Sequence, residues 1–187
     1  MVRMLFLSGL LPVIALVQGS GSETPEAALG GYCPVSIVKM DKLVKGDPAY
    51  SSVYDGKKYL FPSGDAKSMF DANPAAFAPA MGGNCVVCKV EMKKDVPGKP
   101  EIHLVHNGRL YLFPAEEQLK MFKAKPEKYA DADVALGGYC PVCKVDMKKD
   151  VKGKPEFAID YHGMRYLFPA KEQLEKFKAA PEKYTKV

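Results

Sequence analysis

The sequence of 187 residues contains no tryptophan and only three histidines. Beyond its N-terminal segment it has no apolar run of the ~18 residues that a membrane-spanning helix needs. Its formal charge of +5 is too small to indicate nucleic-acid binding, and 47% hydrophobic residues exclude a disordered or collagen-like chain. Because 15 prolines and 16 glycines interrupt the sequence, we expect several small units rather than one extended core.

Residues 1–20 have the pattern of a secretory signal peptide, with a positive start at Arg3, a short apolar run over residues 5–17 and small residues after it. The run is interrupted by Ser8, Gly9 and Pro12, which argues against a membrane span. A buried N-terminal helix is the alternative, although the run has no amphipathic period. We therefore expect an exported protein, periplasmic or secreted, with no membrane span after signal removal.

The strongest feature of the sequence is an internal repeat. Residues 33–77, 85–129 and 140–184 align without gaps; the second and third blocks are identical at 30 of 45 positions, and the first and second at 18 of 45. We expect three tandem modules: module 1 (residues 28–79), module 2 (80–132) and module 3 (133–187). Units of this size bury little surface, so packing between repeats, a metal or a disulfide must add stability.

Each module has the pattern of an α+β unit. In module 3 the apolar positions 157, 159 and 161 alternate, a His162-Gly163 turn follows, and residues 164–168 form a second apolar run, which predicts a β-hairpin. A proline then suits the first residue of a helix of about 12 residues that ends before a second proline. Core packing explains the repeated aromatic pairs of the hairpin, which are Tyr59/Phe61, Tyr111/Phe113 and Tyr166/Phe168.

Five cysteines cannot all pair within one chain, so at least one is free, metal-bound or paired between chains. Module 2 begins with Cys85 and Cys88, and module 3 with Cys140 and Cys143, whereas module 1 has Cys33 followed by Ser36. Two residues between cysteines let a tight turn direct both sulfurs to one point, which is half of a structural zinc site. These cysteines are the candidate site.

Three functions of the cysteine pairs remain open. Two thiolates suffice for Cu(I), and four could bind one Zn²⁺ if the pairs of modules 2 and 3 converge. In an oxidising compartment each pair could instead be a disulfide. Dithiol redox catalysis is the least favoured, because we expect the cysteines in a loop that leads to a hairpin rather than at a helix start. Lys89 and Lys144 occupy the position of the histidine that covalent haem attachment requires.

Other side chains add little to the candidate site. Methionines 40, 92 and 147 follow the cysteines at a fixed spacing; they could bind a soft metal, but we expect them to fill the core beneath the hairpin. His103 and His106 point to opposite faces of a strand, and we expect all three histidines at the surface. No Ser-His-Asp arrangement, phosphate loop or carboxylate pair recurs in the modules, so we expect no enzyme.

Together, the Cys-Pro-Val-Cys or Cys-Pro-Val-Ser start, the hairpin ending Asp-Gly-Lys-Lys-Tyr-Leu-Phe (residues 55–61) and the helix ending Pro-Glu-Lys-Tyr (181–184) resemble the YHS domain. That family is similar to TRASH domains, and the resemblance implies a treble-clef-like fold with a cysteine-bearing knuckle, a hairpin and a helix. Its members occur beside copper-transporting ATPases, which implies metal sensing, delivery or storage. Many members have further cysteines after the hairpin, where this chain has Pro62, Pro114 and Pro169.

The sequence therefore predicts an exported, non-enzymatic metal-binding protein. Cys85, Cys88, Cys140, Cys143 and Cys33 are its expected ligands, copper(I) or zinc is the expected metal, and module 1 is degenerate because a serine hydroxyl is a poor ligand for soft metals. A metal transporter or another envelope protein is the expected partner. The alternative is a structural or interaction repeat in which the cysteine pairs are disulfides, and a dithiol oxidoreductase is the minor possibility.

Overall fold

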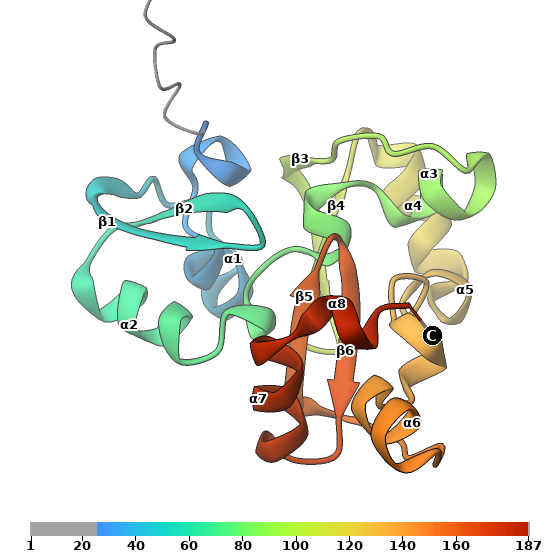
Figure 1. Cartoon of the computed structure of the whole chain (residues 1–187). Helices are drawn as coiled ribbons and strands as arrows, with labels where there is room; N and C mark the ends of the chain where they lie inside the picture. Colours follow the sequence, from blue (N-terminus) through green and yellow to red (C-terminus); the bar gives the residue numbers. More distant parts are fainter. Residues whose placement is uncertain (1–25, 187) are drawn as a thin grey trace, which may run out of the picture.

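The computed structural model describes residues 26–186, which form three similar α+β modules (Figure 1). The signal-peptide prediction concerns residues 1–20, which lie outside this range. Among the described residues, no helix combines the length and the apolar character needed to cross a membrane. Module 1 contains η1 (Ala28–Gly31), α1 (Pro34–Met40), β1 (Asp47–Tyr54), β2 (Lys57–Phe61), α2 (Gly64–Ala72) and η2 (Pro74–Ala76).

The other two modules repeat this order, with a four-residue α-helix in place of η2. Module 2 contains η3 (Ala80–Gly83), α3 (Val86–Met92), β3 (Lys99–His106), β4 (Arg109–Phe113), α4 (Glu116–Ala124) and α5 (Pro126–Tyr129). Module 3 contains η4 (Ala135–Gly138), α6 (Pro141–Met147), β5 (Lys154–Tyr161), β6 (Met164–Phe168), α7 (Lys171–Ala179) and α8 (Pro181–Tyr184).

The predicted hairpins are confirmed. Each module has one two-stranded antiparallel sheet, and in module 3 Tyr161 pairs with Met164 across the turn. His162 and Gly163 have φ values of 52° and 76°, which is the conformation of a type I′ turn. The equivalent turns of modules 1 and 2 also have two residues with positive φ. This turn matches the twist of the strands and fixes the register that directs the aromatic pairs inward.

The prediction that the proline after the hairpin begins a helix is wrong by two residues. Pro62 is followed by Ser63, an extended N-cap residue whose hydroxyl accepts a hydrogen bond from the Ala66 N–H, and α2 begins at Gly64. Ala115 and Ala170 are the equivalent extended caps of α4 and α7. The proline ends the strand instead, because a proline has no N–H to donate to the ladder.

The cysteines do not lie in a loop, which corrects a second prediction. α1, α3 and α6 are seven-residue helices that begin directly after Cys33, Cys85 and Cys140. Proline at the first helical position of α1 and α6 fixes φ for the first turn, and each helix ends at a residue in the left-handed conformation. Two turns are too few for a clear apolar period, so the sequence pattern did not reveal these helices.

One phenylalanine organises the core of each module. Phe122 of α4 is completely buried, and its ring centre lies 4.8 Å from that of Tyr111 and 5.6 Å from that of Phe113. Phe70 of α2 and Phe177 of α7 contact the equivalent hairpin aromatics. The predicted packing of these aromatic pairs in the core is confirmed. In module 2 the cysteine-bearing helix packs against the same core.

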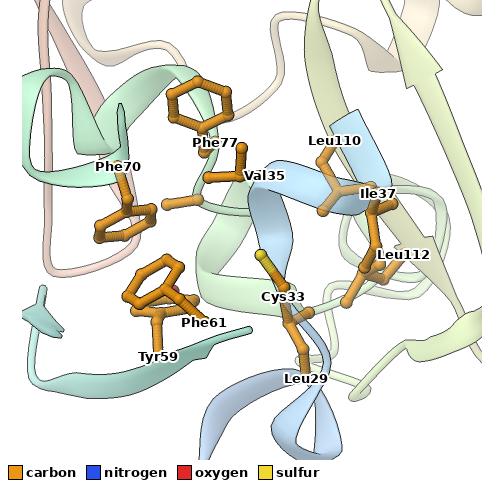
Figure 2. Packing of buried hydrophobic residues seen from close by; sticks show 11 residues of the cluster. Leu29, Cys33, Val35, Ile37, Tyr59, Phe61, Phe70, Phe77, Leu110 and Leu112 are labelled. Atoms are coloured by element: carbon orange, nitrogen blue, oxygen red, sulfur yellow. The ribbon is translucent and has the colours of Figure 1, made fainter. Parts of the chain in front are cut away.

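Modules 1 and 2 share an apolar contact. Figure 2 shows Ile37 of α1 pointing toward Leu110 and Leu112 of β4, and all three side chains are buried. The sulfur of Cys33 points instead into the core of module 1 (Figure 2). The core of module 1 therefore extends onto the hairpin of module 2.

Module 3 joins the other two modules through a buried polar cluster. The backbone N–H of Asp160, in β5, donates to the Tyr54 hydroxyl at 2.7 Å, and the Arg109 guanidinium of β4 pairs with Asp133 and Asp160. Asp133 is completely buried. The hairpin of module 3 also contacts η2 of module 1 and η3 of module 2. Its strands are shown in orange in Figure 1. The three modules thus pack into one body.

The methionines after the cysteines do not fill the core. Met40, Met92 and Met147 are 53%, 51% and 49% exposed, so this prediction is wrong. Each is the last residue of its helix, at the point where the chain leaves the core in a left-handed conformation. The fixed spacing reflects the position of the helix end.

Candidate metal centre

Each cysteine pair lies in the first turn of a short helix. Cys85 is the N-cap residue of α3, and Cys88 is the third helical residue, whose N–H donates to the Cys85 sulfur at 3.4 Å. Cys140 and Cys143 have the same arrangement in α6, with a distance of 3.3 Å. An N-cap side chain normally accepts this hydrogen bond through oxygen, and here a sulfur replaces it. The cap geometry brings both sulfurs of a pair to the same side of the helix start.

The thiols are free and buried. None of the five cysteines is in a disulfide, and their exposed fractions are 2% or less. Burial, followed by the hydrogen bond and charge of the neighbouring cysteine, raises the pKa of Cys88 and of Cys143 to about 11. At neutral pH these two groups are therefore thiols. A helix N-terminus would favour a thiolate, but here the cost of burying the charge is the larger effect.

The two pairs do not converge on one metal ion. Cys85 and Cys88 belong to the core of module 2, and Cys140 and Cys143 to that of module 3. Within residues 26–186, no three His, Cys, Asp or Glu side chains lie close enough together to hold a metal. The alternative of one four-sulfur zinc site across a repeat interface is therefore not supported, because in the described residues each pair has only its own two sulfurs.

Module 1 has the same extended N-cap cysteine, but its sulfur accepts no hydrogen bond from the helix, unlike Cys85 and Cys140. Cys33 is the N-cap residue of α1 and is completely buried, and Ser36 occupies the position of the second cysteine and is buried too. A serine hydroxyl is a poor ligand for soft metals, and one thiol alone is not a chelating site. The structure therefore places Cys33 in the equivalent position without a second sulfur.

Among the described residues, no histidine joins a cysteine pair to form a group of three possible metal ligands. His162 is exposed in the β5–β6 turn, and His106 stacks edge-on against Phe122 at 5.5 Å. His103 differs from the surface prediction: its side chain is 12% exposed, and its Nε2 lies 2.9 Å from a carboxylate oxygen of Asp41 in module 1. Sequence reasoning did not predict this contact because Asp41 lies 62 positions away in the chain.

Comparison with known proteins supports part of the family resemblance. Residues 141–186 match the YHS domain, a family to which metal binding is attributed, and this range holds Cys143 and nearly all of module 3. No solved structure matches the chain significantly. Modules 1 and 2 have the same element order as module 3, and their assignment as YHS copies stays a prediction from the repeat. Module 3 of this chain is thus a match to the YHS domain.

Proposed function

We propose that modules 2 and 3 each bind one Cu(I) ion, through Cys85 and Cys88 and through Cys140 and Cys143. The observation that carries this proposal is the pair of free thiols, held on one side of a helix start and shielded from solvent. Cu(I) accepts two sulfur ligands, whereas structural zinc takes four ligands. The donor set of each module therefore favours copper(I) over zinc.

Binding would exchange protons for metal. Two thiols release two protons and form two sulfur–copper bonds, so each bound site has one negative charge. The N–H of the second cysteine already points at the first sulfur, and this hydrogen bond strengthens when the sulfur becomes a thiolate. Because the second thiol has a raised pKa, protons compete with the metal, and the affinity should rise with pH.

The biological setting of this site is also a proposal. The N-terminal pattern predicts export to the periplasm or the medium, where a non-enzymatic protein with two Cu(I) sites would store or deliver copper. A metal transporter or another envelope protein would exchange the ion with it. The sites are buried, so transfer requires the helix start to open.

The alternative is an interaction repeat in which each pair closes as a disulfide. Module 1 argues against a purely structural function of the cysteine pairs. It adopts the same fold with a serine in place of the second cysteine. A covalent bond in modules 2 and 3 is therefore not needed to form the module. The thiol content of the protein as isolated separates the two functions.

The test is an anaerobic Cu(I) titration against a chromophoric chelator, with the stoichiometry read by native mass spectrometry. The variants are Cys88→Ser, Cys143→Ser and both together, since each recreates the Cys/Ser arrangement that module 1 already accommodates. We expect two ions in the wild type, one in each single variant and none in the double variant. An unchanged stoichiometry would overturn the proposal, as would a reduced wild-type protein that takes up no copper.

A further inference from the structure

A second cluster of metal-ligating side chains lies far from the cysteine pairs, in the groove between modules 1 and 2. The groove has a volume of about 540 Å³ and is lined by the end of α1 and by residues of β3 and α4. Asp41 follows α1 in the left-handed conformation, and its side chain is 85% exposed. His103 of β3 faces it, with its Nε2 2.9 Å from Asp41 Oδ1.

The hydrogen bonds of His103 define which nitrogen is available. Its Nδ1 lies 2.6 Å from the carbonyl oxygen of Pro100, and a carbonyl can only accept, so Nδ1 carries the proton. In the neutral ring Nε2 then holds a lone pair, which faces the carboxylate of Asp41, another acceptor. Two acceptors at this distance repel each other unless a cation, either a proton or a metal ion, lies between or beside them.

The arrangement matches that of a metal-binding histidine. A ligating histidine usually donates its other N–H to a carbonyl or carboxylate, which fixes the ring and its tautomer, and Pro100 provides that contact here. Two ligands at about 2.0–2.1 Å from one ion are about 2.9 Å apart when they subtend a right angle. The observed separation of His103 Nε2 and Asp41 Oδ1 is 2.9 Å, so both atoms are within reach of one ion, and an imidazole together with a carboxylate suits Cu²⁺ or Ni²⁺.

Comparison with the repeat shows that this cluster is specific to one interface. The positions equivalent to Asp41 are Lys93 and Lys148 in modules 2 and 3, and those equivalent to His103 are Ser51 and Ala158 in modules 1 and 3. Two departures from the repeat, 62 residues apart in sequence, thus meet at one point of the fold. Each residue comes from a different module, so the pair exists only when modules 1 and 2 are packed together.

We propose that His103 and Asp41 bind one divalent transition-metal ion of the Cu²⁺ or Ni²⁺ type in this groove, with water completing its coordination. Lys39 and Lys123 also line the groove, and their charges oppose the cation. With only two protein ligands and these lysines nearby, the affinity should be lower than that of a site with three or four protein ligands. This site uses nitrogen and oxygen, so it differs in chemistry from the thiol pairs.

The test is a titration with Ni²⁺, which does not oxidise thiols, followed by calorimetry and by NMR of protein with isotope-labelled histidine. We expect one ion to bind and to broaden the ring signals of His103 more than those of His106 and His162. Asp41→Asn should weaken binding at least tenfold and His103→Asn should abolish it, whereas His106→Asn, on the same strand, should leave it unchanged. Because Asp41 is on the surface, its variant tests the site without disturbing the core.

Two outcomes would overturn this inference. In one, Ni²⁺ does not bind and Asp41→Asn only lowers the melting temperature, which would make the pair an interface ion pair with a protonated imidazole. In the other, Ni²⁺ binds equally well to His103→Asn but not to the Cys88→Ser/Cys143→Ser double variant. That double variant should lose Cu(I) binding and keep Ni²⁺ binding. Cu(I) binding therefore tests the cysteine sites and Ni²⁺ binding tests the His103–Asp41 site, independently of each other.

Discussion

Module 1 and module 3 have the same order of elements but differ at the start of their short helix. In module 3 the first turn of α6 holds Cys140 and Cys143, whereas in α1 it holds Cys33 and Ser36. Both starts are buried and both have an extended cysteine as the N-cap residue. The comparison shows that the second sulfur is not required for the fold, so its presence in modules 2 and 3 calls for a chemical explanation.

The next residue along the helix is apolar in module 1 and charged in modules 2 and 3. Ile37 of α1 is buried against the hairpin of module 2, but the equivalent residues, Lys89 of α3 and Lys144 of α6, reach solvent and pair with Asp95 and Asp150. Module 1 therefore has one thiol fewer and one apolar contact more than modules 2 and 3 have at this helix. In one module the short helix serves as an interface, and in the other two it holds a sulfur pair.

The largest effect should come from restoring the missing sulfur. Ser36→Cys places a second thiol at the third position of α1, which also begins after an extended N-cap cysteine, as α3 and α6 do. Ser36 is buried and only slightly smaller than cysteine, so the fold should be retained. We expect the Cu(I) stoichiometry to rise from two to three, measured by native mass spectrometry under anaerobic conditions.

Ser36→Ala is the matched control for this experiment. It removes the hydroxyl without adding a ligand, so two ions should remain bound. If Ser36→Cys also binds only two ions while its fold is intact, two sulfurs at the helix start are not a sufficient site. The second cysteine would then not explain the difference between module 1 and modules 2 and 3.

The second prediction concerns the stability of the contact between modules 1 and 2, which depends on Ile37. Ile37→Lys introduces the residue found in modules 2 and 3 and buries its charge against Leu110 and Leu112. We expect the free energy of unfolding to fall by about 4 kcal/mol, since a buried Ile is lost and a charge is left unpaired. Urea unfolding measures this change.

Ile37→Val is the control for that substitution, because it removes one methyl group and should cost about 1 kcal/mol. A loss of less than about 1 kcal/mol for Ile37→Lys would mean that the lysine reaches solvent. The contact between modules 1 and 2 would then be weaker than its burial indicates.

Module 3 differs from the other two at Asp160, where modules 1 and 2 have Val53 and Val105. Burial raises the pKa of this carboxyl from 3.8 to about 6, although Arg109 and Arg165 oppose the shift. Since the folded pKa lies above the unfolded one, the fold favours the protonated form. Asp160 therefore adds stability below pH 3.8, and this stability is lost as the pH rises through about 6.

The pH dependence of unfolding tests this assignment. A difference of two pKa units corresponds to about 3 kcal/mol, so the stability of the wild type relative to Asp160→Asn should fall by up to about 3 kcal/mol between pH 4 and pH 7. The comparison with the variant cancels the titration of the other carboxyls. A constant difference across this range would show that Asp160 stays ionised and fully paired with Arg109.

The repeated parts of the fold could be predicted from the sequence, because local rules decide them. The two-residue turns such as Asn107-Gly108 require positive φ, and the period of the hairpin directs Tyr111 and Phe113 inward. The short helices escaped prediction because seven residues show no clear period, and so the pattern placed Cys85 and Cys88 in a loop.

The contacts between modules could not be predicted at all. Asp133, Arg109 and Asp160 form a buried cluster, but each alone has the pattern of an ordinary surface charge. Their meeting depends on how three modules pack, and no local periodicity reports it. Asp41 and His103 illustrate the same limit, since their significance appears only when two modules are placed side by side.

The smallest expected effect concerns the methionines, whose fixed spacing suggested a place in the core. Met147 is half exposed at the end of α6, so Met147→Leu should change the free energy of unfolding by less than about 0.5 kcal/mol. Because the site is proposed to need only Cys140 and Cys143, the Cu(I) affinity of module 3 should also stay the same. A loss of affinity with unchanged stability would instead make the thioether a third ligand. Because module 1 also has this methionine, Met40, the difference between the modules would still lie at Ser36.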